Sequence, residues 1–349
     1  MSVQKERKPD FNRLRQVLLR ESMPDAVPFY DLFADQEVIS HATQKASSNA
    51  SIAEFFYKMG YDYIPVWIGS NYGEKRIIAD DTSPELSKGK RQFTDENHGV
   101  IENRADFDSY IWPEEEDWGI SSVSSMAQHL PAGMKLIVSL RGVFESTMYL
   151  MSLVPLCYAL YEDEQLVLDI FEHVGKTQLK LIQACFKKSD LSTIGAVTIC
   201  DDMGYVQGTF LTPECMRKFA FPWMKKCVDL VHGYDLPVIM HACGNLEKVM
   251  DDLIDYVGID ARQSFEDKIL PVTAAKEKYG SRIAVLGGID IHFLCTSTED
   301  QVRKHVRNVL RKCMVGGGYA LGTGNSVPNY VPYKNYLAML DEGKKYVLS

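Results

Sequence analysis

Leu236-Pro-Val-Ile-Met-His-Ala-Cys-Gly244 is the stretch that decides the fold and the chemistry of this 349-residue chain. Its first five residues are apolar and partly β-branched, which predicts a short buried strand. His241 and Cys243 follow at the carboxyl end of that strand, where ligands collect in α/β proteins. Imidazole and thiolate both bind zinc, so the pair predicts a zinc site with an open position. The alternative is a histidine and a cysteine that only pack in the core.

Short apolar runs of the same kind recur along the chain, and helical patterns separate most of them. Eight such runs predict an α/β protein with a (β/α)₈ barrel, here a single domain over residues 1–349. We also expect an N-terminal helical extension and an irregular excursion, with no clear helix, over residues 70–118. The predicted strands are 27–33, 61–68, 135–140, 196–200, 236–240, 258–261, 282–286 and 318–322.

Three helices carry clear sequence signals. Residues 212–231 begin with threonine at the cap position and proline in the first turn. Residues 297–314 combine a good N-terminal cap with apolar positions at helical spacing. The apolar stretch 148–160 predicts one buried helix.

Composition excludes several classes of protein. The net charge is −9 and the sequence has no long basic run, so we expect no nucleic-acid partner. The chain also lacks a run of 18 apolar residues and an apolar leader in its first residues, so we expect neither a membrane span nor a signal peptide. Eight cysteines without framework spacing favour reduced thiols in the cytoplasm.

Acidic residues follow three of the predicted strands. Asp201 and Asp202 come directly after residues 196–200 and could bind a metal or act as a base, or could cap a helix and face solvent. Glu145 follows residues 135–140, where it either complements a helix dipole or faces the pocket. Asp290 follows residues 282–286 and could orient a partner or cap a helix. We predict that Asp202, Glu145 and Asp290 are catalytic.

Three further residues are predicted to contact substrate. Trp67 ends the second predicted strand and could form the wall of an aromatic site, although core packing is the commoner role of tryptophan. Tyr205 and Asn325 lie just beyond the fourth and eighth strands.

The strand-end motifs together resemble the uroporphyrinogen decarboxylase superfamily, from about Pro24 to the end of the chain. The resemblance implies a (β/α)₈ barrel. The motifs that carry it are Asp201-Asp-Met-Gly204, Thr212-Pro-Glu214, His241-Ala-Cys-Gly244, Tyr279-Gly-Ser-Arg-Ile-Ala-Val-Leu-Gly-Gly-Ile-Asp290, and Gly324-Asn-Ser-Val-Pro-Asn-Tyr-Val-Pro332 followed by Asn335.

The decarboxylases of that superfamily carry an Arg-Gln-Ala-Gly-Arg motif after the first strand. The corresponding stretch here, Tyr30-Asp-Leu-Phe-Ala-Asp-Gln36, has no arginine. Their aspartate after the second strand is missing near Val66 and Trp67, and their late histidine matches Gly324. A substrate with many carboxylates needs cationic partners, so we do not expect porphyrinogen decarboxylation.

The other branch contains zinc methyltransferases of corrinoid-dependent methyl transfer, which use the His-x-Cys pair found here at His241 and Cys243. Their usual second cysteine matches Asn325, a weak zinc ligand, so a carboxylate would complete the site. Asp202 and Glu145 are the candidates, with Asp201 behind them. A more oxygen-rich zinc is harder and more Lewis-acidic, which favours an ether or phenolic oxygen over a thiol such as coenzyme M.

The resemblance therefore implies a zinc-dependent methyltransferase of the O-demethylase type. The methyl donor would be a methylated small molecule, such as a methoxylated aromatic compound. The acceptor would be cobalamin on a separate corrinoid protein, because the chain has no Asp-x-His-x-x-Gly motif. Two alternatives remain open: a decarboxylase-like lyase, and a non-catalytic member that binds a tetrapyrrole or another small ligand. A homodimer is compatible with either.

Overall fold

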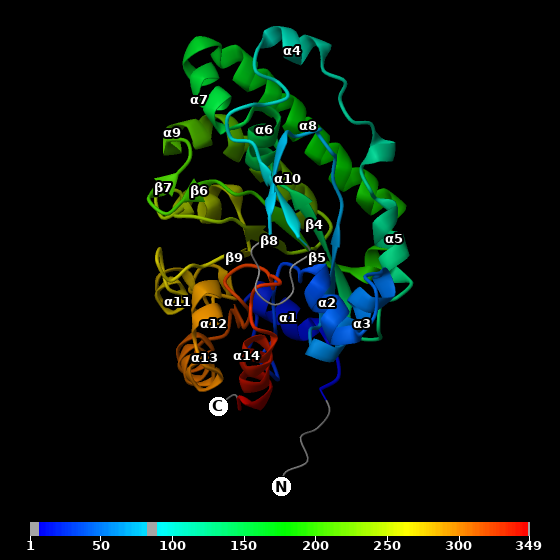
Figure 1. Cartoon of the computed structure of the whole chain (residues 1–349), viewed down its shortest axis with the longest axis vertical. Helices are drawn as coiled ribbons and strands as arrows, with labels where there is room; N and C mark the ends of the chain where they lie inside the picture. Colours follow the sequence, from blue (N-terminus) through cyan, green and yellow to red (C-terminus); the bar gives the residue numbers. More distant parts are fainter. Residues whose placement is uncertain (1–6, 82–88, 348–349) are drawn as a thin grey trace.

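A curled parallel sheet lies at the centre of the computed structural model, which describes residues 7–81 and 89–347 (Figure 1). Helices surround the sheet, as in a (β/α)₈ barrel, so the predicted fold is confirmed. The seven strands, in spatial order, are β1 (Tyr63–Trp67), β4 (Lys135–Arg141), β5 (Ile194–Cys200), β8 (Val238–His241), β9 (Ala261–Gln263), β10 (Ala284–Leu286) and β11 (Tyr319–Ala320).

The predicted first strand, residues 27–33, occupies the eighth position but is paired less regularly than the others. Phe29 forms an isolated parallel bridge with Leu321, and the Tyr30 amide donates to the Leu321 carbonyl at 2.8 Å. The carboxylate of Asp31 is fully buried and accepts from the Thr323 amide at 2.8 Å. The barrel therefore closes between the two ends of the chain.

The barrel strands are buried on both faces, as expected for parallel strands covered by helices. All seven residues of β5 are buried. Aromatic side chains pack around the first strands of the barrel. The ring centroids of Tyr30 and Tyr63 lie 5.4 Å apart in a stacked arrangement, and those of Phe56 and Tyr61 lie 5.0 Å apart edge to face.

The outer helices agree with the capping signals. The Thr298 side chain accepts from the Gln301 amide and begins α13 (Glu299–Cys313), so the helix predicted over 297–314 is confirmed. The Thr212 side chain likewise caps the helix predicted over 212–231. That helix comprises α9 (Pro213–Cys215), a π-helical turn (Met216–Ala220) and α10 (Phe221–His232). The remaining elements around the barrel include α5 (Ser121–Ala127), α8 (Glu164–Lys188), α11 (Val272–Tyr279), a second π-helical turn (Asp252–Val257) and α14 (Tyr333–Lys345).

The N-terminal helical extension is also confirmed. Helix α1 (Phe11–Leu18) covers the amino ends of the strands, where the Phe11 amide donates to the Gly133 carbonyl at 2.8 Å. A buried ion pair between Arg13 and Asp62, at 2.6 Å, fixes α1 against the residue before β1. Two more helices, α2 (Gln36–Thr43) and α3 (Asn49–Met59), precede β1.

The prediction of one buried helix over 148–160 is wrong. The segment belongs to two helices, α6 (Val143–Met151) and α7 (Leu153–Glu162), which meet at an angle of 91°. Ser152 forms the corner with a φ of 64°, and Tyr161 of α7 is 92% exposed. In the described part of the chain, no single helix is long and apolar enough to cross a membrane. Only this bent pair together meets that length and composition.

The excursion over 70–118 is more regular than predicted. It contains an antiparallel hairpin of β2 (Arg76–Asp80) and β3 (Lys90–Thr94), the short helix α4 (Arg104–Ser109) and a 3₁₀ turn (Glu115–Asp117). Its residues 82–88 lie outside the described residues. Ion pairs of Glu74 with Arg141 at 3.3 Å and of Arg91 with Asp35 at 2.7 Å hold the excursion against residues at or just beyond the carboxyl ends of barrel strands.

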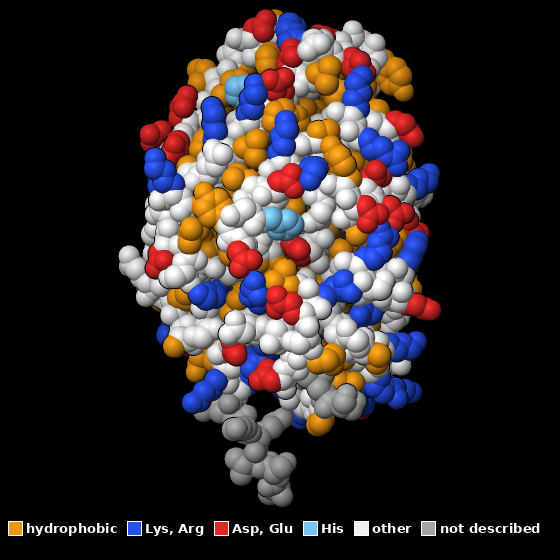
Figure 2. All heavy atoms as spheres, turned by 180° about the vertical axis from the view of Figure 1, so that it is seen from behind, with side chains coloured by type: hydrophobic (Ala, Val, Ile, Leu, Met, Phe, Trp, Pro, Cys, Tyr) orange, Lys and Arg blue, Asp and Glu red, His pale blue; other side chains and the backbone are white. Residues whose placement is uncertain are grey.

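Acidic and basic side chains are interspersed over the face shown in Figure 2, which is opposite to the face in Figure 1. Although the net charge of the chain is −9, this face therefore does not form one continuous acidic surface.

Candidate metal centre

Three side chains that can bind a metal converge at the carboxyl ends of β5 and β8. The ligand atoms of Asp202, His241 and Cys243 all lie within 4.8 Å of one another. The His241 Nε2 atom is 3.7 Å from Cys243 Sγ and 3.8 Å from Asp202 Oδ1. The two strands are neighbours in parallel register, with Cys200 opposite His241, so residues that follow either strand reach the same place.

The backbone around this cluster is held in a fixed shape. The Asp202 carboxylate accepts from the Cys243 amide at 2.7 Å, and the Asp201 amide donates to the His241 carbonyl at 2.8 Å. Gly244 has a φ of +84°, and a Cβ there would lie 2.1 Å from the carbonyl carbon of Gly204. Only glycine permits both the positive φ and this close approach of the two loops.

The imidazole of His241 is buried, and its two nitrogens have different neighbours. Nδ1 contacts the Gln263 side-chain oxygen, whereas Nε2 faces Cys243 and Asp202. Burial lowers the pKa of His241, with Asp202 and Gln263 opposing the shift. The ring is therefore neutral near pH 7, and a neutral imidazole is the form that binds metals.

The thiol of Cys243 lies among polar hydrogen-bond partners. Its Sγ is 3.2 Å from the Asn325 side-chain nitrogen and 3.6 Å from the Ser264 hydroxyl. Burial raises the pKa of the Cys243 thiol, and the Asp202 carboxylate raises that pKa further. A bound metal ion would reverse this, because a coordinating thiol is deprotonated outright.

The separations from the His241 imidazole fit a tetrahedral metal. Zinc bonds of about 2.0–2.3 Å place tetrahedral ligand atoms about 3.3–3.8 Å apart. The two separations from His241 Nε2 lie at the upper end of that range. One histidine, one cysteine and one carboxylate give a three-residue donor set that leaves the fourth position open, as in catalytic rather than structural zinc sites.

Asp201 has another role in the structure. Its carboxylate accepts from the amides of Glu145 at 2.6 Å and Phe144 at 3.2 Å, so it binds the amino end of α6. A Cβ at Gly142 would lie 2.2 Å from this carboxyl group, which leaves no room for a side chain. Burial raises the pKa of Asp201 to about 7, although the backbone donors oppose the shift.

Glu145 lies in the first turn of α6, where its half-buried side chain is hydrogen-bonded to Tyr149. Burial and then the nearby Asp202 raise the pKa of Glu145 to about 8, against the opposing effect of Arg141. In the metal-free protein this carboxyl group therefore holds a proton at pH 7. A protonated acid beside a metal site can give that proton to a departing group.

Asp290 lies apart from the three-residue cluster. It caps α12 (Ile291–Thr296), where one carboxylate oxygen accepts from the Phe293 amide at 2.9 Å. The other oxygen accepts from the Asp267 amide at 3.0 Å. Of the two interpretations of Asp290, the structure therefore displays the helix cap.

The three residues predicted to contact substrate lie at or beyond the carboxyl ends of barrel strands. Trp67 ends β1, is 42% exposed and meets Phe33 edge to face at 6.3 Å. Tyr205 lies in the hairpin of β6 (Gly204–Tyr205) and β7 (Gly208–Thr209), is 49% exposed and stacks on Phe210 at 5.7 Å. Asn325 contacts the sulfur of Cys243, so of the three it lies in direct contact with the cluster.

Sequence reasoning missed two polar residues at the site, Gln263 and Ser264. The sixth strand was expected over 258–261, but β9 runs over Ala261–Gln263. The boundary is shifted because Gly258 and Asp260 belong to the approach to the strand, where Gly258 has a φ of +86°. Had the predicted strand ended at residue 263, Gln263 and Ser264 would have been identified as polar residues at a strand end, as His241 was.

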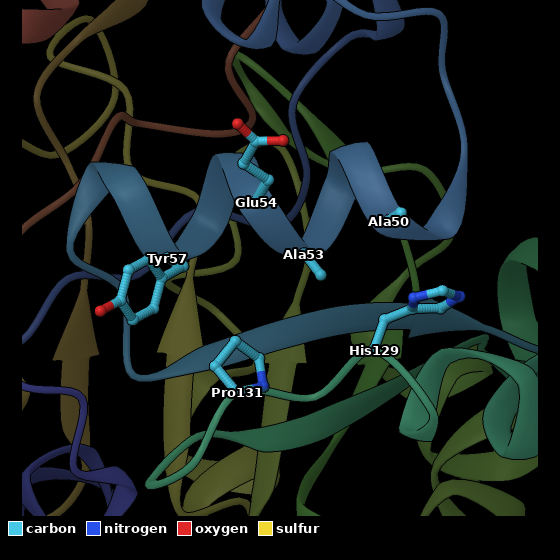
Figure 3. Close-up of a pocket in the computed structure, with 6 residues that line it drawn as sticks. All are labelled: Ala50, Ala53, Glu54, Tyr57, His129 and Pro131. Atoms are coloured by element: carbon cyan, nitrogen blue, oxygen red, sulfur yellow. The ribbon is translucent and has the colours of Figure 1, made fainter.

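A separate shallow pocket of about 270 Å³ lies between α3 and the turn before β4 (Figure 3). Both segments precede barrel strands, so the pocket lies toward the amino ends of the strands, away from the metal cluster. Glu54 in this pocket is paired with Lys45 and Lys58. Its lining residues are Ala50, Ala53, Glu54, Tyr57, His129 and Pro131.

Comparison with known families adds to this geometry. The model of the uroporphyrinogen decarboxylase (URO-D) family matches residues 96–346. The chain belongs to this family. Within the URO-D family, it is 24% identical over 179 residues to uroporphyrinogen decarboxylase of Methylobacillus flagellatus, which covers 49% of this chain and 47% of that protein.

Methyltransferases are also among the relatives of this URO-D family member. Methylcobamide:CoM methyltransferase MtbA of Methanosarcina acetivorans is 26% identical over 134 residues, covering 38% of this chain and 37% of that protein. The chain thus spans less than half the length of these two curated relatives. A solved methyltransferase from Methanosarcina mazei superposes with a TM-score of 0.73 at 13% identity, over 96% of this chain and 98% of that one, which supports the barrel fold.

Proposed function

We propose that this URO-D family member is a zinc-dependent methyltransferase. It would transfer a methyl group from a methylated small molecule, such as a methoxylated aromatic compound, to a separate corrinoid protein. The single observation that carries the proposal is the convergence of Asp202, His241 and Cys243 within 4.8 Å at the mouth of the barrel. The kinship with a methylcobamide methyltransferase supports the same reaction class.

The metal would be held by the neutral Nε2 of His241, the thiolate of Cys243 and the carboxylate of Asp202. Zinc bound there would supply a Lewis acid for the oxygen that loses its methyl group. Asn325, where the methyltransferases of the resemblance carry a cysteine, donates toward the sulfur instead of adding a second thiolate. The donor set therefore has more oxygen character, which suits an oxygen leaving group.

The residues around the metal have separate roles in this proposal. Glu145, which holds a proton at pH 7 in the metal-free protein, would be the group that gives a proton to the departing oxygen. Trp67 at the end of β1 and Tyr205 beyond β5 have exposed aromatic side chains that can pack against an aromatic methyl donor. Asp290, a helix cap here, would only support the loop after β10.

Porphyrinogen decarboxylation is disfavoured by the same geometry. Residue 324, where the decarboxylases of the resemblance carry a histidine, is a glycine whose Cβ would lie 2.6 Å from the Phe265 carbonyl oxygen. A histidine there would require the loop to move. The stretch after the first strand segment contributes the buried carboxylate of Asp31 rather than an arginine.

Two measurements on the purified chain test the proposal. Elemental analysis should find about one zinc per chain, and His241→Ala should lose it. Cob(I)alamin should lose its absorbance as methylcobalamin forms when methoxylated aromatic donors are added. A metal-free protein would refute the zinc site and favour the non-catalytic ligand-binding alternative, whereas a zinc protein that never methylates cob(I)alamin would refute the methyltransferase assignment.

A further inference from the structure

We infer that Gln263 is a positioning residue that determines which ring nitrogen of His241 is free to bind a metal. The inference rests on the metal-binding role proposed for His241. Gln263 ends β9 directly opposite His241 of β8, because the two residues are paired in the parallel register. Its side chain is fully buried and lies between the imidazole and the loop after β11.

The two ends of the Gln263 amide have different partners. One end contacts Nδ1 of His241, and the other contacts the backbone carbonyl oxygen of Asn325. A carbonyl oxygen can only accept, so the amide nitrogen must face Asn325 and donate to it. The amide oxygen is then left facing His241, where it can only accept.

This polarity fixes the tautomer of the histidine. Nδ1 of His241 has to carry the hydrogen, because otherwise two buried acceptors would face each other without a donor between them. The lone pair then lies on Nε2, the nitrogen that faces Cys243 and Asp202. Reversing the amide would bring two acceptors together at Asn325, so the glutamine cannot turn without losing a hydrogen bond.

Asn325 is therefore linked by hydrogen bonds to both proposed metal ligands at the end of β8, His241 and Cys243. Its side chain contacts the sulfur of Cys243, and its carbonyl orients Gln263 and, through Gln263, His241. The same backbone carbonyl also accepts from the Leu32 amide at 3.5 Å. The loop after the last strand thus sets the orientation of the histidine without touching it.

The tautomer can be measured without any metal. In metal-free protein labelled with ¹⁵N-histidine, and with His241→Ala used to assign the signal, His241 should show a protonated Nδ1 and a bare Nε2. Gln263→Met removes both hydrogen bonds at nearly constant volume, and His241 should then populate the tautomer with the hydrogen on Nε2. Co²⁺ affinity, followed by the thiolate-to-cobalt absorbance, should fall roughly 10- to 100-fold.

Two further variants separate positioning from general damage. Gln263→Glu keeps an acceptor toward His241 and loses the donor toward Asn325, so it should retain the protonated Nδ1 and recover much of the Co²⁺ affinity lost in Gln263→Met. Gln178→Met makes the same change at another buried glutamine, whose amide donates to Ser146 at 3.2 Å, and should leave Co²⁺ binding unchanged.

The outcomes distinguish this inference from the proposed function. A wild-type His241 with its hydrogen on Nε2 would overturn the inference, as would a Gln263→Met protein with unchanged tautomer and unchanged Co²⁺ affinity. A protonated Nδ1 in a wild-type protein that binds neither Zn²⁺ nor Co²⁺ would instead refute the metal site and leave the role of Gln263 in orienting His241 intact.

Discussion

Replacing Glu145 by glutamine should stabilise the metal-free protein at neutral and alkaline pH. The pKa of Glu145 is raised from 4.5 to about 8, so the folded state retains a proton that the unfolded state releases. Glu145 therefore lowers the unfolding free energy by nothing below about pH 4.5. Above that pH the loss of unfolding free energy grows by about 1.4 kcal/mol per pH unit, and it levels off above about pH 8. It reaches about 3 kcal/mol at pH 7 and about 5 kcal/mol at pH 9.

Glutamine resembles the protonated acid in shape and has no charge to bury. The difference in unfolding free energy between Glu145→Gln and wild type should thus be near zero at pH 4.5 and should rise with pH. Urea denaturation with a chelator present, at pH values from 4.5 to 9, measures that difference directly. Glu116→Gln, at an exposed position, is the matched control and should give a flat profile. A flat profile for Glu145→Gln as well would refute the argument that Glu145 is buried as a neutral acid.

The other predictions concern the metal and the reaction. His241→Ala and Cys243→Ala should each lose most bound zinc by mass spectrometry while keeping the circular dichroism of the wild type, because an open site adds little to a core of this size. Asp202→Ala should lower zinc content and methyl transfer more than Glu145→Gln does, and the reverse order would identify Glu145 as the ligand. No coproporphyrinogen should form from uroporphyrinogen, and formation at a steady enzymatic rate would contradict the argument from Gly324. Methyl transfer should stop when cob(I)alamin is omitted, and turnover without it would point to another acceptor.

The barrel could be predicted because short apolar segments recur along the sequence and several of them end in an abrupt change from apolar to polar residues. Residues 236–240 are apolar and are followed at once by the polar pair His241 and Cys243. The same contrast marks Asp201 and Asp202 after β5. The alternation of short apolar segments with helical patterns therefore located seven strands of the barrel. It also placed Asp202, His241 and Cys243 at the same end of the sheet.

The features that escaped prediction depend on contacts distant in sequence. The corner at Ser152 needs a positive φ that nothing in an apolar run signals. The β2–β3 hairpin is fully or largely exposed, so it lacks the alternation of buried and exposed residues that marks a strand. Gln263 was missed because the end of a three-residue strand is uncertain by about as much as its own length.

The bridge between Phe29 and Leu321 joins residues that lie far apart in the sequence and are therefore synthesised at different times. Until the segment around Leu321 has emerged from the ribosome, the edge formed by residues 28–30 has no partner. An open sheet edge of this kind readily pairs with other chains. We therefore expect nascent chains and C-terminal truncations that stop before residue 319 to aggregate or to recruit chaperones. A chain that includes the segment around Leu321 conceals that edge and buries the carboxylate of Asp31 in the same step.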